Sequence, residues 1–399
     1  MRCVSSQTVA QSFAWLLTDD GQAVLSRAVE ASAEPGYDEL ALQGELRRGT
    51  RPERVALAIT QAELRRRATG KFGELAARMY FTPDGLEQAT RLSVSTHRAS
   101  RLQAAVTQSV VDLGCGIGGD LVAFARAGIT TAGVDLDPLR VAMARANLAA
   151  LELGGAVQEA DATAVDSSPF DVAFADPARR SGAGRSFRVE DWTPPWSFVE
   201  SLLRRDACVK VAPGIPHAIV PAGVEAEWVS DHGEVKEAAL WSGRLATDAR
   251  RATVIGDGGL ATLTDADDPG TEIVGVGTLG GFLYEPDGAV IRAGLVTAVA
   301  AGVQGRLLDS KIAYVTSDEA YRSPFARSYR VLEEVPYREK QLRAALRARG
   351  IGTLTIKKRG VDGSPEQLRK RLDLHGEDEA TLVLTRARGR GIALLVKPF

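Results

Sequence analysis

The sequence predicts an α/β protein with a doubly wound parallel sheet at its centre, a helical region before it and a small α+β domain after it. Three observations lead to this fold class. Strand-like and helix-like runs alternate at short spacing from Ser109 onward, which is the pattern of a parallel sheet covered on both faces. The residues before Ser109 carry apolar side chains at helical spacing. About the last 65 residues mix strand-like and helix-like runs.

The predicted helical region covers residues 1–80. Its apolar side chains recur at the spacing of an amphipathic helix, most clearly in Phe13–Leu17, Ala23–Leu25 and Val55–Ile59. Pro and Gly residues at 35–36 and 49–52 separate these runs. A further helical segment is expected over Leu86–Leu102.

The central domain is expected to cover residues 81–330. Its predicted strands are Ser109–Leu113, Thr130–Asp135, Val157–Ala160, Phe170–Ala175 and Ala207–Val211. Its predicted helices are Asp120–Ala127, Leu139–Leu153 and Trp192–Arg204. Later strands, possible antiparallel partners, are indicated over Glu227–Trp241 and Ala252–Ile255, with loops over Gly256–Gly259 and Asp265–Gly270.

The third predicted domain covers residues 331–399 and is of a size that can fold alone. Its helices are expected over Arg338–Arg349 and Pro365–Leu372, and its strands over Leu354–Lys358, Thr381–Thr385 and Ile392–Val396. The order αβαββ indicates a small α+β fold.

Composition narrows the class of protein. The chain has 399 residues, of which 45% are hydrophobic and 25% charged, as in ordinary globular proteins. No run approaches the roughly 20 apolar residues that cross a bilayer, and the N-terminus lacks the apolar core of a signal peptide. Three scattered cysteines and four separated histidines predict neither a disulfide framework nor a metal site. We therefore expect a cytoplasmic protein without a membrane or metal requirement.

Charge is distributed unevenly along the chain. Residues 330–399 contain 16 Lys and Arg against 9 Asp and Glu, a net +7, whereas the remaining residues contain 33 against 42, a net −9. A basic domain beside an acidic body indicates a polyanionic partner. A solvated helix face in a chain that prefers Arg would give the same count.

The first predicted strand ends in a glycine-rich turn. Gly114, Gly116 and Gly119 match the pattern GxGxxG, and Asp135 follows at the end of the next strand. Such glycines let the backbone approach a ligand, and the acid can accept ribose hydroxyls. The alternative interpretation of this pattern is a tight strand-to-helix turn with an acidic cap and no bound ligand. Asp112 would face the pyrophosphate of a dinucleotide, so it favours S-adenosylmethionine, which carries an ammonium and a sulfonium.

The motifs resemble those of the class I S-adenosylmethionine-dependent methyltransferases, which have a Rossmann-like sheet. Val111–Gly119 is similar to their first motif, Gly133–Pro138 to their second-strand acid, and Asp161-Ala162 to their adenine position. More distantly, Asp112–Asp120 resembles the glycine run of trimethylguanosine synthases, together with the upstream segments Phe81–Pro83 and His97–Ala99.

The basic C-terminal module resembles the THUMP-like domain of a group of bacterial methyltransferases, and Tyr284–Gly294 ahead of it belongs to the same resemblance. THUMP domains bind RNA. The resemblance therefore implies that RNA is the substrate and that this domain contacts it.

The resemblance also implies roles for individual residues. The cofactor-binding residues would be Asp112, Gly114, Cys115, Gly116, Asp135, Leu136, Asp161 and Ala162. Asp176 and Pro177 would be catalytic, because they begin the motif with which aminomethyltransferases orient the target amine. Ala178 and Arg179 replace the usual proline and aromatic residue, so Arg179 and Arg180 would contact the substrate. Trp192 or Trp196 could supply an aromatic face instead.

These residues predict an enzyme that N-methylates an exocyclic amine of a base in RNA, using S-adenosylmethionine. One alternative is a methyltransferase for a small molecule or a protein. The C-terminal cations decide between them, since an RNA enzyme needs one basic face formed by Arg343, Arg347, Lys357, Lys358 and Arg359. A protein that binds S-adenosylmethionine or RNA without catalysis is a further alternative, and an NAD-dependent dehydrogenase is the least favoured because of Asp112.

Overall fold

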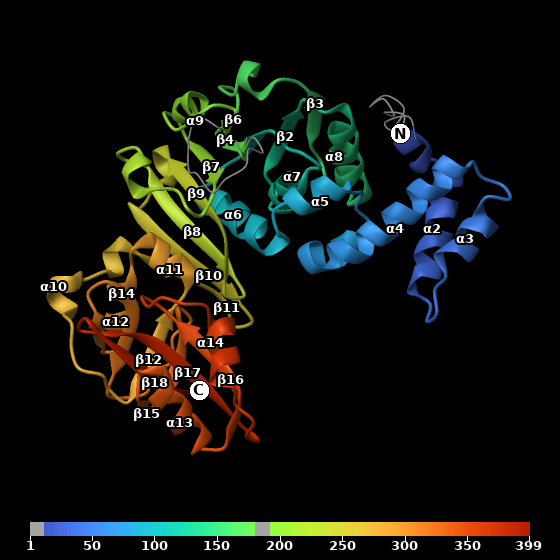
Figure 1. The fold of residues 1–399 in the computed structure, drawn as a ribbon. Coiled ribbons are helices and arrows are strands. Elements are labelled where there is room, and N and C mark those ends of the chain that lie inside the picture. Colours follow the sequence, from blue (N-terminus) through green and yellow to red (C-terminus); the bar gives the residue numbers. More distant parts are fainter. Residues whose placement is uncertain (1–11, 180–191) are drawn as a thin grey trace. The chain divides into compact units, whose positions relative to one another are not determined.

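The computed structural model describes residues 12–179 and 192–399, except for the side chains of Ala178, Arg179 and Trp192. The chain divides into two compact units (Figure 1). The first unit contains Met1–Val211, Ile215–Val224 and Ala239–Thr247, and the second contains Ala212–Gly214, Glu225–Ala238 and Asp248–Phe399. Strand β9 (Glu234–Ser242) has residues in both units.

The first unit begins with helices, as predicted. Residues 12–16 are helical, and the helices that follow are α2 (Asp19–Ala33), α3 (Glu39–Leu46), α4 (Pro52–Phe72), α5 (Pro83–Gln88) and α6 (Leu92–Ala104). Side chains of Thr18, Asp38 and Thr82 cap the N-termini of α2, α3 and α5, where backbone N–H groups lack partners within the helix. The single segment predicted over residues 86–102 is wrong, because extended backbone at Ala89 and Arg91 separates two helices there.

A parallel sheet forms the centre of this unit. Its strands are β1 (Ser109–Leu113), β2 (Thr130–Asp135), β3 (Ala156–Glu159), β4 (Val172–Ala175) and β7 (Ala207–Val211), in the order β7-β4-β1-β2-β3. All four neighbouring pairs are parallel. The helices between them are α7 (Gly119–Arg126), α8 (Pro138–Ala150) and α9 (Trp196–Leu202). The predicted alternation and the bounds of three strands are confirmed.

The helix predicted over residues 192–204 is wrong in its first part. Trp192–Thr193 forms a short strand, β6, that pairs with β5 (Ala178–Arg179), and α9 begins only at Trp196. Pro194 and Pro195 explain the difference, because proline disfavours the helical conformation in the residue before it and lacks an N–H.

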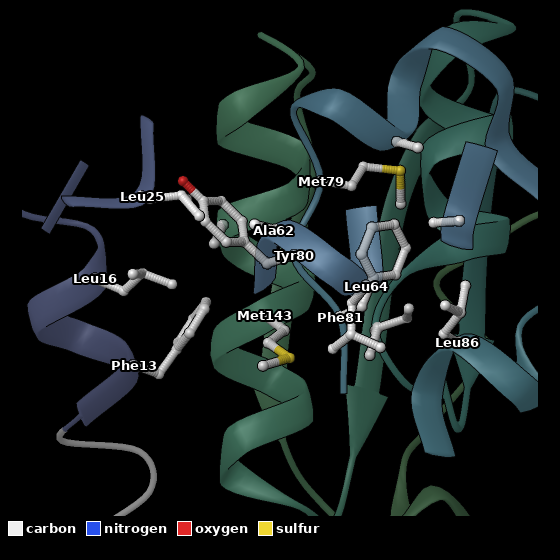
Figure 2. Packing of buried hydrophobic residues seen from close by; sticks show 14 of the residues in the cluster. Phe13, Leu16, Leu25, Ala62, Leu64, Met79, Tyr80, Phe81, Leu86 and Met143 are labelled. Carbon is white, nitrogen blue, oxygen red and sulfur yellow. The ribbon is translucent and has the colours of Figure 1, made fainter. Parts of the chain in front are cut away.

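One apolar cluster joins the N-terminal helices to the sheet helices. It runs from Phe13 to Val157 and includes residues of α2, α4, α7 and α8. Figure 2 shows Phe13 and Leu16 on one side of the cluster, with Tyr80 and Met143 near its middle. The rings of Phe13 and Tyr80 meet edge to face with centroids 5.5 Å apart. The helical region is therefore packed onto the sheet domain and shares its core.

Two buried amides fix the chain between α4 and α5. Asn147 of α8 accepts a hydrogen bond from Tyr80 N at 2.6 Å, and its Nδ2 donates to Tyr80 O and Ile117 O at 3.1 and 2.8 Å. Gln61 of α4 exchanges two hydrogen bonds with the backbone of Phe81, at 2.6 and 3.0 Å. Because Ile117 lies in the glycine-rich turn, Asn147 connects that turn to the N-terminal region.

The second unit contains strands β8 (Glu225–Asp231), β10 (Arg250–Gly256) and β11 (Gly259–Thr264), with β10 parallel to β8 and antiparallel to β11. Helices α10 (Thr271–Val274), α11 (Gly288–Ala293) and α12 (Val296–Gly302) follow. A seven-stranded sheet has the order β13-β14-β12-β15-β18-β17-β16. Its strands are β12 (Phe282–Pro286), β13 (Arg306–Asp309), β14 (Ile312–Ser317), β15 (Ala326–Val335), β16 (Ile351–Lys358), β17 (Asp378–Ala387) and β18 (Arg390–Pro398), with helices α13 (Glu339–Arg347) and α14 (Pro365–Leu372).

Several features of the second unit differ from the prediction. The αβαββ order after residue 338 is present as α13, β16, α14, β17 and β18. However, the sheet also contains β12 to β15, so its hydrogen bonding begins at Phe282, upstream of the predicted domain start at 331. The loops predicted around residues 256–270 enclose β11, whose half-buried residues give a weak apolar signal.

Replacing Asn147 by alanine tests the link between the glycine-rich turn and the N-terminal region. The substitution leaves Tyr80 N, Tyr80 O and Ile117 O without their buried partner. We expect the free energy of unfolding to fall by about 3 kcal/mol, because unsatisfied buried polar groups cost about 1–3 kcal/mol each. Urea unfolding followed by circular dichroism measures this. The exposed Gln88→Ala is the matched control, and equal stability of both variants would contradict the role of Asn147.

Candidate active site

The candidate site lies where the strand order of the parallel sheet reverses. Strand β1 is flanked by β2 and β4, and the chain runs to β2 and β3 on one side before it returns to β4 on the other. Ligands of open α/β sheets bind at the carboxyl ends of the strands beside such a point. Asp112 is the penultimate residue of β1, Asp135 is the last residue of β2, and Asp176 directly follows β4. The register Leu113↔Ala175 places these ends at one level, so the sheet brings the three predicted carboxylates to one edge.

The turn after β1 leaves room for a ligand. Gly114 and Gly116 have φ values of +107° and +56°, a region that side chains other than glycine rarely adopt. A Cβ atom at either position would meet nothing within 4 Å, whereas at Gly118 it would lie 3.1 Å from Ala144 Cβ. Gly118 therefore serves helix packing, and Gly114 and Gly116 present bare backbone to open space.

Asp135 is buried and holds this turn. Its Oδ2 accepts a hydrogen bond from Gly116 N and its Oδ1 accepts one from Asp137 N, both at 2.9 Å. An ionised carboxylate has about four acceptor positions, so two remain for hydroxyl groups of a ligand. The next side chain, Leu136, is 67% exposed and offers an apolar surface beside them.

Asp112 carries the clearest sign of a missing partner. It is 2% exposed, and its Oδ1 has no hydrogen-bond partner in the described protein. Burial, followed by repulsion from Asp120 and Asp176, raises the pKa of Asp112 well above its usual value, and only Arg98 among the main contributors opposes this. A buried acceptor in an acidic surrounding suits a cationic ligand, so the ammonium of S-adenosylmethionine fits this position.

Cys115 points away from the open space. Its thiol is buried, and a Cβ on Gly133 of β2 would lie 3.0 Å from its Sγ. Burial raises the pKa of the Cys115 thiol, which keeps it protonated and unreactive. Cys115 can therefore contribute only backbone atoms to a bound cofactor.

Asp161 and Ala162 lie just after β3, at the far end of the same edge. Asp161 is exposed and caps the 3₁₀ helix η2 (Ala162–Ala164), accepting hydrogen bonds from Thr163 N at 2.9 Å and Thr163 Oγ1 at 2.7 Å. The bonds from Thr163 lower the pKa of Asp161. These hydrogen bonds fix the Asp161 carboxylate just after the end of β3.

An ion pair with Asp176 is the feature that the sequence analysis missed. Lys210 Nζ lies 2.5 Å from Asp176 Oδ2 and donates to Thr90 Oγ1 at 3.2 Å. The register Ala175↔Val209 between β4 and β7 places Asp176 beside Lys210. A lysine near the end of the fifth predicted strand was the available signal. The ammonium of Lys210 fixes the Oδ2 atom of the Asp176 carboxylate.

A second buried pair supports the site from beneath. Arg98 of α6 is 1% exposed, donates a hydrogen bond to Asp120 of α7, and stacks over the ring of Phe174 at 4.7 Å. Both Arg98 and Asp120 lie in segments that the sequence analysis singled out by resemblance. Their interaction fixes α7 against α6. It also places the positive charge of Arg98 close enough to Asp112 to oppose the rise in its pKa.

The predicted substrate residues are only partly described. Pro177 is half-buried beside Asp176, and the backbone of Arg179 lies in β5. Arg180 and the side chains of Arg179 and Trp192 lie outside the described part of the structure. Trp196 is described, and its indole N–H donates to Glu200 at 3.0 Å.

Within residues 12–179 and 192–399, no three His, Cys, Asp or Glu side chains are grouped as metal ligands. No helix in the same ranges is long and apolar enough to span a bilayer.

Three family models match the chain. Residues 110–179 match a methyltransferase domain, residues 326–398 match the THUMP domain-like family, and residues 10–68 match a domain of unknown function. The first match covers the glycine-rich turn, Asp135 and Asp176, and the second begins at β15.

Relatives extend the similarity to most of the chain. An uncharacterized S-adenosylmethionine-dependent methyltransferase of Mycobacterium tuberculosis strain H37Rv is 38% identical over 345 residues, which cover 84% of this chain and 93% of the relative. The protein of strain CDC 1551 matches equally. The crystal structure of a proposed methyltransferase from Porphyromonas gingivalis W83 has the same fold, with a TM-score of 0.72 and 22% identity over 94% of this chain and 98% of that one.

The raised pKa of Asp112 predicts how the stability of the ligand-free protein changes with pH. The folded state binds this proton more tightly than the unfolded chain, whose aspartates titrate near pH 4. The contribution of Asp112 to the free energy of unfolding is therefore greatest below about pH 4. It falls as the pH rises from there toward the raised pKa. Asp112→Asn removes this contribution. We expect the urea midpoint to fall less steeply between pH 5 and 8 for Asp112→Asn than for the unchanged protein. Parallel curves would show that ionisation of Asp112 does not destabilise the folded protein and would contradict the prediction.

Proposed function

The chain belongs to the S-adenosylmethionine-dependent methyltransferases, and from that premise we propose that it methylates an exocyclic amine of a base in RNA. The cofactor predicted from the sequence is thereby confirmed at the level of the family. The observation that carries the proposal is the Asp176 carboxylate, held by Lys210 at the strand end beside the glycine-rich turn.

The cofactor would be held along the edge described above. Asp112 would accept the ammonium of its methionine part, the backbone of Gly114 and Gly116 would approach it closely, and Asp135 would accept the ribose hydroxyls. Leu136, Asp161 and Ala162 would border the adenine. When bound, S-adenosylmethionine supplies an electrophilic methyl group on a sulfonium, so no further activation of that group is needed.

The protein's part in catalysis is then positioning and charge stabilisation. Asp176 Oδ1 and the carbonyl of Pro177 would accept hydrogen bonds from the two N–H groups of the target amine, which directs its lone pair toward the methyl group. The amine nitrogen gains positive charge as it forms the new bond. Asp176 would lie beside that charge and take the proton that the nitrogen releases. Lys210 keeps the Asp176 carboxylate in place throughout.

The RNA part of the proposal is supported by the THUMP domain-like match and by the net charge of +7 in residues 330–399. The expected basic face does not support it. Lys357 and Arg359 lie 2.9 and 3.8 Å from Glu285, and Arg347 lies 3.4 Å from Asp373. Arg343 contacts Glu339 and Arg371 O, and Lys358 donates to Val361 O and Gly363 O.

All five cations of the predicted face are thus engaged within the protein. This observation favours the second candidate, a methyltransferase for a small molecule or a protein. RNA binding requires other cations of the second unit.

Substituting Asp176 tests methyl transfer. Purified protein is incubated with methyl-labelled S-adenosylmethionine and total RNA from cells that lack the protein. We expect label in RNA, and Asp176→Ala to lower the initial rate at least about 100-fold, because it removes the group that orients and stabilises the amine. Glu30→Ala, an exposed carboxylate change in the same unit, should leave the rate unchanged.

Lys210→Met adds a positioning test. We expect kcat to fall by about tenfold with unchanged affinity for S-adenosylmethionine, because Asp176 keeps its charge but loses its fixed orientation. Digestion of the labelled RNA identifies the methylated nucleoside. If S-adenosylmethionine binds but RNA takes up no label, the RNA proposal is wrong, and label in small molecules or proteins of the same extract would support the second candidate.

A truncation after Arg330 would not isolate the C-terminal domain. Arg330 lies within β15, which pairs with both β12 and β18. The cut would remove three strands of the seven-stranded sheet, β16 to β18, and part of β15, so point substitutions are the appropriate test of RNA recruitment.

A further inference from the structure

The second unit contains a cavity that no part of the proposed catalytic site explains. Its volume is about 450 Å³, and it lies where β15 begins and β18 ends. The lining residues are Arg322, Ser323, Ala326, Arg327, Ser328, Tyr329, Pro398 and Phe399. Two arginines and two serines line it together with aromatic rings, and no Asp or Glu side chain is among these described residues. This composition suits an anionic ligand with a flat apolar part.

A row of side chains crosses the sheet beside the cavity. In the register of β12, β15 and β18, Phe282 pairs with Arg330, and Arg330 pairs with Lys397. Residues opposite each other on antiparallel strands project from the same face, so an aromatic ring and two cations stand side by side. Like charges directly opposite one another destabilise a sheet. A bound anion between Arg330 and Lys397 would remove that repulsion.

The cations at this place differ from the five predicted ones. Arg322, Arg330 and Lys397 are all exposed. Over residues 12–179 and 192–399, none of these three takes part in an ion pair, and the guanidinium of Arg330 lies over the ring of Phe282, 5.7 Å from its centroid. Their charge is therefore available to a partner, whereas that of Lys357 or Arg347 is neutralised by a nearby carboxylate. Arg327 projects from the opposite face of the sheet, where its register partner is Glu285.

Aromatic surface accompanies the charge. Phe399 is 40% exposed, and its ring meets those of Phe282 and Tyr284 edge to face, with centroids 5.3 and 6.4 Å apart. The neighbouring rings hold Phe399 in place, so stacking on its outer face costs little conformational entropy. Cations that follow a phosphate backbone, combined with aromatic rings that stack on bases, are the two elements of single-strand recognition.

We infer that the basic-aromatic face, formed by Arg322, Arg330, Lys397, Phe282 and Phe399, binds single-stranded RNA. The cations contact phosphates and Phe399 stacks on a base. The inference rests on the proposed function, since it assigns to the RNA substrate a contact surface in the second unit. A free nucleotide in the cavity, or a protein partner, would be a different outcome of the test below.

The experiment measures binding of the full chain to a fluorescein-labelled 12-nucleotide single-stranded RNA by fluorescence anisotropy, at 50 and 200 mM salt. We expect Arg330→Ala/Lys397→Ala to weaken binding about tenfold at the lower salt concentration. Each lost phosphate contact lowers the slope of log affinity against log salt by about 0.7 for single strands, so this slope should fall by about 1.4.

The matched control is Arg338→Ala/Lys340→Ala. It removes two exposed cations of the same unit, so the change in net charge is identical, and we expect less than a twofold effect. Phe399→Ala should weaken binding about five- to tenfold with an unchanged salt slope, because it removes stacking and no charge. Thermal unfolding of each variant shows whether the fold is retained, and Arg330→Lys/Lys397→Arg, which keeps both charges, should bind within about threefold of the unchanged protein.

Equal losses from both double substitutions would overturn the inference, as would full binding by Arg330→Ala/Lys397→Ala or no binding by the unchanged protein. Displacement of the RNA by a free nucleotide at low micromolar concentration would show a small-ligand site instead. The methylation assay separates the two proposals. Binding at this face without methylation of RNA refutes the proposed function alone, and methylation that is insensitive to these substitutions refutes the basic-aromatic face alone.

Discussion

The structure depends on the placement of three carboxylates at one edge of a parallel sheet. Asp112, Asp135 and Asp176 belong to adjacent strand ends, and their mutual repulsion in a partly dry environment opposes folding. Each has a different compensation. Backbone N–H groups bind Asp135, Lys210 pairs with Asp176, and Arg98 lies near Asp112. Asp112 Oδ1 is buried without a hydrogen-bond partner among the described residues, and we propose that a cationic cofactor supplies that partner.

The packing around the carboxyl edge of the sheet stabilises the glycine-rich turn. The glycine-rich turn needs positive φ angles at Gly114 and Gly116, and these positions contribute no side-chain contacts that would hold the turn. Asn147 holds the turn instead, because its side chain donates hydrogen bonds to both Ile117 O and Tyr80 O. The apolar cluster from Phe13 to Val157 packs α8 and α4 into one core. The N-terminal helices thus stabilise a turn that is shaped for a ligand at the expense of its own packing.

Sequence patterns predicted what depends on local order. The strands Ser109–Leu113, Thr130–Asp135 and Ala207–Val211 are short runs rich in small and β-branched residues between clear breaks, and their bounds are as predicted. Because carboxyl ends of parallel strands meet at one edge, the proximity of the three carboxylates followed from the same pattern. Whether the individual residues bind cofactor or substrate stays a prediction.

Features that depend on long-range pairing were missed. Lys210 reaches Asp176 only through the register of β4 and β7, and strands β12 to β15 were not predicted as part of the C-terminal sheet. The pairing of the C-terminal cations within the protein could not be predicted for the same reason. Glu285, which pairs with Lys357 and Arg359, lies 72 residues before Lys357 in the chain. Charge counts along a segment do not reveal such partners, whereas strand register does.

We propose that Asp112, whose buried Oδ1 has no hydrogen-bond partner among the described residues, holds a proton that it releases when S-adenosylmethionine binds. Calorimetric titration of S-adenosylmethionine at pH 6, in two buffers of different ionisation enthalpy, measures the protons released on binding. The account predicts measurable proton release by the unchanged protein, and both loss of that release and at least about tenfold weaker binding in Asp112→Asn. Equal proton release and equal affinity in the two proteins would contradict it.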